Sequence, residues 1–145
     1  MRASVAIYQY FVRRCIDMAV NVISTEKAPG AVGPYSQAIK AGDFLFASGQ
    51  IAIDPEKGRI TAGTVAGQAE QCMKNVGAIL EAAGATYDNV VKTTVYINDM
   101  NFFGAVNEVY GKYFQKTLPA RSCVEISKLP KDAMVEVEVI AYVGK

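Results

Sequence analysis

Arg121 is the residue whose position in this sequence raises the clearest chemical question. It lies in the stretch "LPARSCVEI" (residues 118–126), just before the apolar Val124 and Ile126 of what reads as a buried strand. A guanidinium at the start of a core strand is costly to bury unless a partner offsets its charge. We therefore expect Arg121 to pair either with an acidic side chain of the protein or with an anionic ligand.

Two stretches near the C-terminus alternate between apolar and polar residues, as half-buried β-strands do. We expect their apolar residues to face the helices and their polar residues to share the opposite surface. That polar row consists of Arg121, Cys123, Glu125, Glu136 and Glu138. If the strands are neighbours, the row is either a solvated face with cross-strand ion pairs or a polar pocket completed by another subunit.

The composition excludes several kinds of chemistry. The 145 residues contain no histidine, which excludes Ser-His-Asp and Cys-His nucleophiles and histidine-ligated metals. Cys15, Cys72 and Cys123 are too scattered to indicate a metal site or a disulfide framework. The net charge is +1, without a basic run that would bind nucleic acid, and no apolar stretch approaches the roughly 18 residues of a membrane span. We expect a single cytoplasmic domain.

Two helices are predicted between the strands. Residues 65–83 place apolar side chains at helical spacing, after an N-cap at Thr64 and before a stop at Gly84. Residues 101–114 form the second helix, capped by Asp99 or Asn101. Strands are predicted over residues 20–24, 36–40, 44–48, 90–97, 121–127 and 134–143. This order predicts an α+β domain with one mixed six-stranded sheet and both helices on one face.

The first 17 residues differ from the rest of the chain. They contain three arginines and one acidic residue, with apolar side chains at helical spacing. They are either a mitochondrial transit peptide or a short extension before the domain, and we favour the extension. The predicted boundaries are residues 1–17 for the extension and 18–145 for the domain.

Five separate motifs resemble the RidA/YjgF family of reactive-intermediate deaminases. They are "GPYSQAI" (33–39), "SGQI" (48–51), "VVKTTVYINDM" (90–100), "VNEVYGKYF" (106–114) and "PARSCVEISKLPKDAMVEVEVIA" (119–141). The resemblance implies a chorismate-mutase-like fold and a homotrimer with active sites between subunits. It also implies hydrolysis of enamines and imines, such as 2-aminoacrylate, 2-iminopropanoate and 2-iminobutanoate, to 2-keto acids and ammonia without a metal or other cofactor.

The resemblance also assigns roles to individual residues. It makes Arg121 the ligand of the substrate carboxylate and places Glu136 near the attacking water. The remaining substrate-binding positions are Tyr35, Gly49, Asn107 and Cys123. From the residues themselves, Cys123 equally reads as a packing residue, because there is no histidine to activate it. Tyr35 reads as a loop anchor and Asn107 as a surface amide.

Two other functions remain open at this level. The first is a binding or sensing module that holds a 2-keto acid without turnover, since one fold hosts many activities. The second is RNA cleavage or inhibition of translation, a role that the resemblance attaches to some members of the family. The missing histidine and basic patch count against it.

The predicted boundary can be tested by deletion. A chain that begins at Met18 should keep its oligomeric state, its thermal stability and any activity, because residues 1–17 lie before the domain. Light scattering, thermal melting and enzyme assays of the two chains, compared side by side, check this. Loss of any of these properties would place the extension inside the folded unit.

Overall fold

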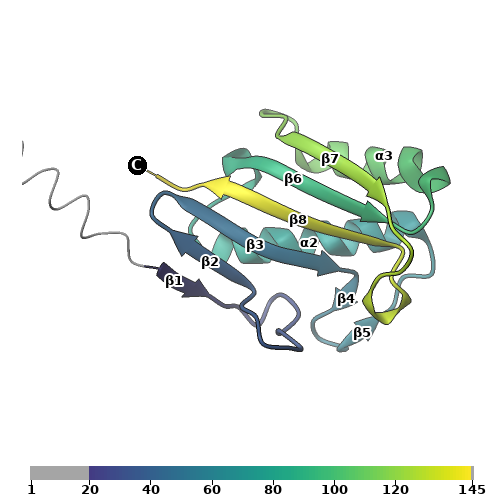
Figure 1. Ribbon diagram of the computed structural model, residues 1–145, viewed down its shortest axis with the longest axis horizontal. Helices are drawn as coiled ribbons and strands as arrows, with labels where there is room; N and C mark the ends of the chain where they lie inside the picture. Colours follow the sequence, from purple (N-terminus) through teal and green to yellow (C-terminus); the bar gives the residue numbers. More distant parts are fainter. Residues whose placement is uncertain (1–19, 145) are drawn as a thin grey trace, which may run out of the picture.

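The computed structural model describes residues 20–144, which form a six-stranded sheet with two helices on one of its faces (Figure 1). The strand order is β1–β2–β3–β8–β6–β7. The strands are β1 (Val20–Ile23), β2 (Ala38–Ala41), β3 (Phe44–Ile51), β6 (Val90–Ile97), β7 (Ala120–Glu125) and β8 (Val135–Tyr142). The predicted α+β architecture is confirmed. The predictions for residues 1–17 lie outside the described residues.

The last strand of the chain lies at the centre of the sheet. β8 pairs antiparallel with both β3 and β6, whereas β6 and β7 pair parallel. A parallel neighbour requires a crossover connection, which here contains the helix α3 (Phe103–Tyr113). β7 lies at the edge of the sheet, beside β6, which contributes residues to the core.

The longer helix, α2 (Val65–Ala82), has nearly the predicted bounds. Gly67 N donates a hydrogen bond of 3.1 Å to Thr64 Oγ1, which confirms the predicted N-cap. Gly84 follows the helix with φ = 72°, a conformation that suits glycine. α3 begins two residues later than predicted, because Met100–Phe102 form a separate 3₁₀ turn. In that turn, Asp99 Oδ1 accepts from Asn101 N at 2.8 Å.

A small second sheet was not predicted from the sequence. β4 (Ile53–Asp54) and β5 (Arg59–Ile60) pair antiparallel directly after β3. Asp54 Oδ1 accepts hydrogen bonds from Glu56 N at 3.0 Å and Lys57 N at 3.3 Å, which closes the turn. No helix within residues 20–144 is long and apolar enough to cross a membrane.

The two faces of the main sheet differ in what covers them. α2 and α3 cover one face (Figure 1), and the side chains of β8 at positions 135, 137 and 139 are buried there. No helix of the described chain covers the other, which we call the open face. Six of its large apolar side chains are exposed: Val20, Val22, Phe44, Phe46, Val124 and Tyr142.

Candidate active site

A cleft of about 470 Å³ opens where β3 ends and β8 begins. Its walls are the loop between β1 and β2, the end of β3, and the turn that precedes β8. Three of the predicted site residues line it: Tyr35, Gly49 and Glu136. Lys131 and Glu138 also reach it, so the cleft has two carboxylates and one cation beside its apolar walls.

Glu136 lies directly against the backbone of Gly49. The pairing of β3 with β8 shifts register between Ala47 and Gln50, and such irregularities re-aim neighbouring side chains. A Cβ atom at position 49 would overlap Glu136 Oε1. The family resemblance made Gly49 a substrate-binding position. In the structure, the group that approaches it is the Glu136 carboxylate.

The surroundings of Glu136 favour its protonated form. Burial raises the pKa of the Glu136 carboxyl above its ordinary value, and the Glu138 carboxylate on the same face of β8 raises it further. Glu138 itself accepts a hydrogen bond from Tyr96 Oη at 3.2 Å. A carboxylate with a raised pKa is a better proton acceptor near neutral pH than an ordinary one, so Glu136 is suited to general acid–base chemistry.

Tyr35 lies in the loop between β1 and β2 and is half exposed. Its N–H donates to Gly33 O at 2.8 Å, and its hydroxyl accepts from Val32 N at 3.4 Å. These contacts hold the ring over its own loop, at the rim of the cleft. The side chain can therefore contact a bound molecule, as the family resemblance implies.

Arg121, Asn107 and Cys123 form a second cluster, outside this cleft. Arg121 Nη1 donates a hydrogen bond of 2.6 Å to Asn107 Oδ1. The guanidinium carbon lies 4.8 Å from the ring centre of Tyr110 and 5.5 Å from that of Phe103, within the range of cation–π contacts. Arg121 is exposed and has no carboxylate partner within residues 20–144. Within the described chain Arg121 therefore does not pair with an acidic side chain, which was one of its two expected partners.

The aromatic support of Arg121 is anchored in the core. Thr93 is fully buried in β6, opposite Arg121 in the parallel pair, and its Oγ1 shares a hydrogen bond of 2.8 Å with Tyr110 Oη. These aromatic side chains of α3 were not among the site residues predicted from the sequence. The spacing of Phe103, Asn107 and Tyr110 on one helical face is the signal that could have identified them.

Cys123 does not have the character of an activated nucleophile. Burial raises the pKa of its thiol above the ordinary value, and the nearby Arg121 lowers it only in part. A thiol with a raised pKa is mostly protonated at neutral pH. The geometry thus favours a packing or backbone role for Cys123.

The single polar row expected from the sequence does not exist. Arg121 pairs with Thr93, which faces the helices, whereas Glu136 pairs with Tyr96, which faces the opposite way. Arg121, Cys123 and Glu125 therefore lie on the helix side of the sheet, and Glu136 and Glu138 lie on the open face. The expectation failed because β7 is an exposed edge strand, in which Val124 faces the open side.

The two clusters are thus on opposite faces of one sheet and cannot act together within one chain. Each offers a different chemistry: a planar cation with one edge free, and a carboxylate with a raised pKa in a cleft. Within residues 20–144, no group of three His, Cys, Asp or Glu side chains could hold a metal ion.

The chain and its fold are similar to those of known proteins. Residues 25–143 match the family described as Endoribonuclease L-PSP. A RutC family protein of Pyrococcus abyssi is 55% identical over 86% of this chain and 98% of its own length. The 2-iminobutanoate/2-iminopropanoate deaminase of Mus musculus is 51% identical over 86% of this chain and 92% of its own length. The crystal structure of the Escherichia coli YjgF gene product superposes with a TM-score of 0.81, at 46% identity, over 84% of this chain and 98% of that one.

The contact between Gly49 and Glu136 can be tested by Gly49→Ala. The added methyl group should displace the Glu136 side chain into solvent, so that the pKa of this carboxyl falls toward its ordinary value. Because a flexible side chain can move away, the loss of stability should stay below about 1 kcal/mol, less than the 1–3 kcal/mol typical of an overpacked core. An NMR titration of the Glu136 carboxyl carbon and thermal melts measure both effects.

Gly104→Ala is the matched control, because a Cβ at this position in α3 meets no atom within 4 Å. It should leave the Glu136 titration unchanged. An unchanged titration in Gly49→Ala as well would contradict the contact.

Proposed function

The chain belongs to the Endoribonuclease L-PSP family, also called RidA/YjgF, and we propose that it hydrolyses 2-imino acids and their enamine tautomers to 2-keto acids and ammonia. The proposed substrates are 2-aminoacrylate with its tautomer 2-iminopropanoate, and 2-iminobutanoate. Mammalian relatives about 50% identical to this chain carry the name 2-iminobutanoate/2-iminopropanoate deaminase.

The observation that carries the proposal is the chemical match between the two clusters and such a substrate. A 2-imino acid has a carboxylate directly bonded to the electrophilic imine carbon. Arg121 presents a planar cation suited to the carboxylate, and Glu136 presents a proton acceptor suited to a water molecule. Two neighbouring groups of the substrate would thus meet two different protein groups.

Arg121 would bind the substrate carboxylate through two parallel hydrogen bonds. The guanidinium fork matches a carboxylate in a way that the ammonium group of lysine cannot. Asn107 takes one N–H of Nη1, and the rings of Tyr110 and Phe103 support the cation. These contacts orient the fork before the substrate arrives, which lowers the entropic cost of binding.

Glu136 would manage the water and its protons. With the imine nitrogen protonated, the water oxygen bonds to the imine carbon while Glu136 accepts one of the water protons, which gives a neutral carbinolamine. Glu136 then returns that proton to the nitrogen, the carbon–nitrogen bond breaks to release ammonia, and the hydroxyl group loses its proton to solvent as the keto group forms. Orientation of the substrate and one general base are sufficient for this reaction, and a protonated imine nitrogen makes the carbon more electrophilic.

A second copy of the chain would bring the two clusters together. We propose a homotrimer in which Arg121 of one copy faces the Glu136 cleft of the next. Contact between two different surfaces is heterologous and can close into a ring. The exposed apolar side chains of the open face support such an assembly, because monomeric proteins rarely leave large apolar patches in water.

RNA cleavage is the second candidate, because the family description contains the word endoribonuclease. Neither cluster suits it well. The described cleft has two carboxylates beside one lysine, and carboxylates repel a phosphate backbone. A binding module without turnover remains the third candidate, and the activity assay separates it from the enzyme.

Substitution of the two central residues tests the proposed reaction. Release of keto acid from 2-aminoacrylate, generated in the assay by a dehydratase, should fall about 10- to 100-fold in Arg121→Lys, as expected for loss of a charge-assisted hydrogen bond of roughly 1.5–3 kcal/mol. In Glu136→Gln, turnover should fall by roughly 10²-fold or more, whereas binding of pyruvate or 2-ketobutyrate should be nearly unchanged.

The pH dependence of the parent protein provides a further check. Glu136 must be ionised to accept a proton, so kcat/KM should rise with pH through its raised pKa, above the ordinary value of 4.5. Glu136→Gln should lack this limb. Parent-like turnover in both variants would assign Arg121 and Glu136 to structure, and release of RNA fragments without keto acid would favour the second candidate.

The proposed assembly has a direct physical test. Light scattering should give about three times the 15.6 kDa mass of one chain. Phe46→Asp places a charge on the open face and should dissociate the assembly and abolish turnover while far-UV circular dichroism stays normal. A parent protein that is monomeric and active would exclude the composite site.

A further inference from the structure

Buried polar side chains are few in the described chain, and their placement is not random. Within residues 20–144 they are Gln37, Gln50, Gln68, Asn75 and Thr93. Thr93 shares a hydrogen bond with Tyr110 beneath Arg121, and the other four are amides. Burying an amide is costly unless it is hydrogen-bonded, and no buried side-chain N or O atom of these residues lacks a partner.

Asn75, on the buried face of α2, holds the wall formed by the end of β3. Its Nδ2 donates hydrogen bonds of 3.0 Å to Ile51 O and 2.9 Å to Ile53 O. Both isoleucines line the cleft, and Ile51 is the register partner of Glu136. The amide therefore fixes the strand segment that lies between the bulge at Gly49 and the short hairpin.

Gln68 lies two turns before Asn75 on the same helix. It holds a second wall of the cleft, the turn that precedes β8. Its Oε1 accepts from Met134 N at 2.8 Å. Met134 joins β8 to a turn in which Lys131 and Asp132 have φ values of 59° and 53°. Such left-handed conformations are unfavourable for residues with a Cβ and persist only where the surroundings hold them.

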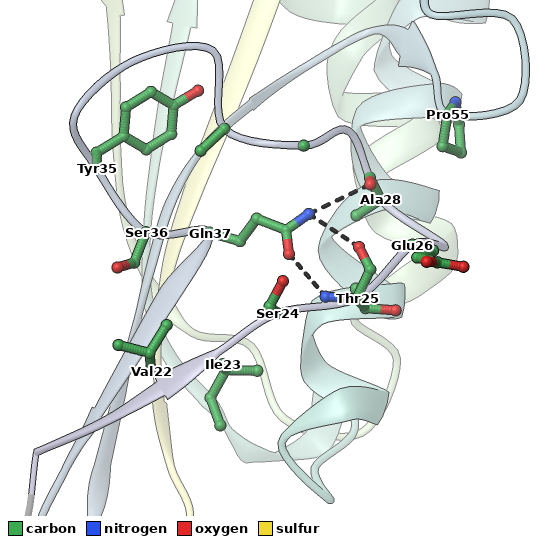
Figure 2. Close-up of a pocket in the computed structure, with 12 residues that line it drawn as sticks. Val22, Ile23, Ser24, Thr25, Glu26, Ala28, Tyr35, Ser36, Gln37 and Pro55 are labelled. Atoms are coloured by element: carbon green, nitrogen blue, oxygen red, sulfur yellow. Dashed lines mark hydrogen bonds between the residues drawn. The ribbon is translucent and has the colours of Figure 1, made fainter.

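Gln37 holds the third wall, the loop that carries Tyr35 (Figure 2). Its Oε1 accepts from Thr25 N at 2.7 Å, and its Nε2 lies 3.0, 3.2 and 2.8 Å from the carbonyl oxygens of Thr25, Ala28 and Pro29. Figure 2 shows this side chain between the two arms of the loop. Pro29 and Tyr35 both line the cleft.

We infer that Gln37, Gln68 and Asn75 are positioning residues, which hold three separate walls of the cleft so that the Glu136 carboxylate stays against Gly49. Apolar side chains would fill the same space. Directed hydrogen bonds also fix the position of each backbone segment along the element beside it. The link to catalysis rests on the proposed deaminase function; the effect on Glu136 does not.

Several titratable groups face Glu136, and the test must leave them unchanged. On its own side of the sheet they are Glu138 on β8, Tyr96 on β6, and Lys131 and Tyr35 on the loops; across the sheet, the buried Cys72 thiol on α2 also interacts electrostatically with it. Asn75→Leu and Gln68→Met are close in size to the parent residues and add no charge. Any change in the titration of Glu136 then reports its position and hydration.

The experiment compares these two variants with Val76→Ala, which removes fully buried apolar atoms from the same helix and no hydrogen bond to the cleft. The Glu136 carboxyl carbon is titrated by NMR in the parent and in these three variants. The spectrum of Glu136→Gln identifies its signal. The apparent pKa should fall toward the ordinary value in Asn75→Leu and Gln68→Met, and stay at the parent value in Val76→Ala.

Turnover is measured on the same samples below their melting temperatures. Both amide variants should lose at least about 10-fold in kcat with little change in binding of pyruvate, whereas Val76→Ala keeps the parent kcat. Equal losses of melting temperature in all three variants, with parent-like titration and kcat, would overturn the inference. If the parent lacks deaminase activity, the proposed function fails, and the titration still decides whether the amides position Glu136. If one amide variant does not fold, the other decides.

Discussion

The alternation of side chains along a β-strand is the constraint on which the rest of this structure depends. Neighbouring positions point to opposite faces, and the register places Arg121 opposite Thr93 and Glu136 opposite Tyr96. One central sheet thus separates a cation from a carboxylate by its full thickness. A shift of β8 by one residue would bring them to the same face but would expose the core row of β8.

This separation explains why each cluster has its own support. Arg121 is stacked on side chains of α3, where Thr93 anchors Tyr110 from the buried side. Glu136 is held on the other face by the bare backbone of Gly49 and by walls that buried amides connect. The cation needs no burial because its partners are an amide and aromatic rings, whereas the carboxylate needs partial burial because that is the main cause of its raised pKa.

The open face connects these clusters with the proposed assembly. The same face carries Glu136 near the end of the sheet and a patch of exposed apolar side chains, most of them on β1 and β3. Burying this patch against another copy would offer a favourable free energy of association, and the polar cleft would lie at the rim of that contact.

The sequence by itself determined the elements and the chemical inventory. Helical spacing, the Thr64 cap and Gly84 predicted α2 within one residue, and alternation predicted β6 and β8, because these signals are local. The absence of histidine limited catalysis to groups such as carboxylates and arginine. Only the tertiary structure decided which face each side chain occupies. In the edge strand β7, apolar and polar residues are both exposed, so its sequence pattern does not show which residues face the helices. Only its pairing with β6 decides that. The contact of Glu136 with Gly49 likewise joins residues 87 positions apart, which no local pattern encodes.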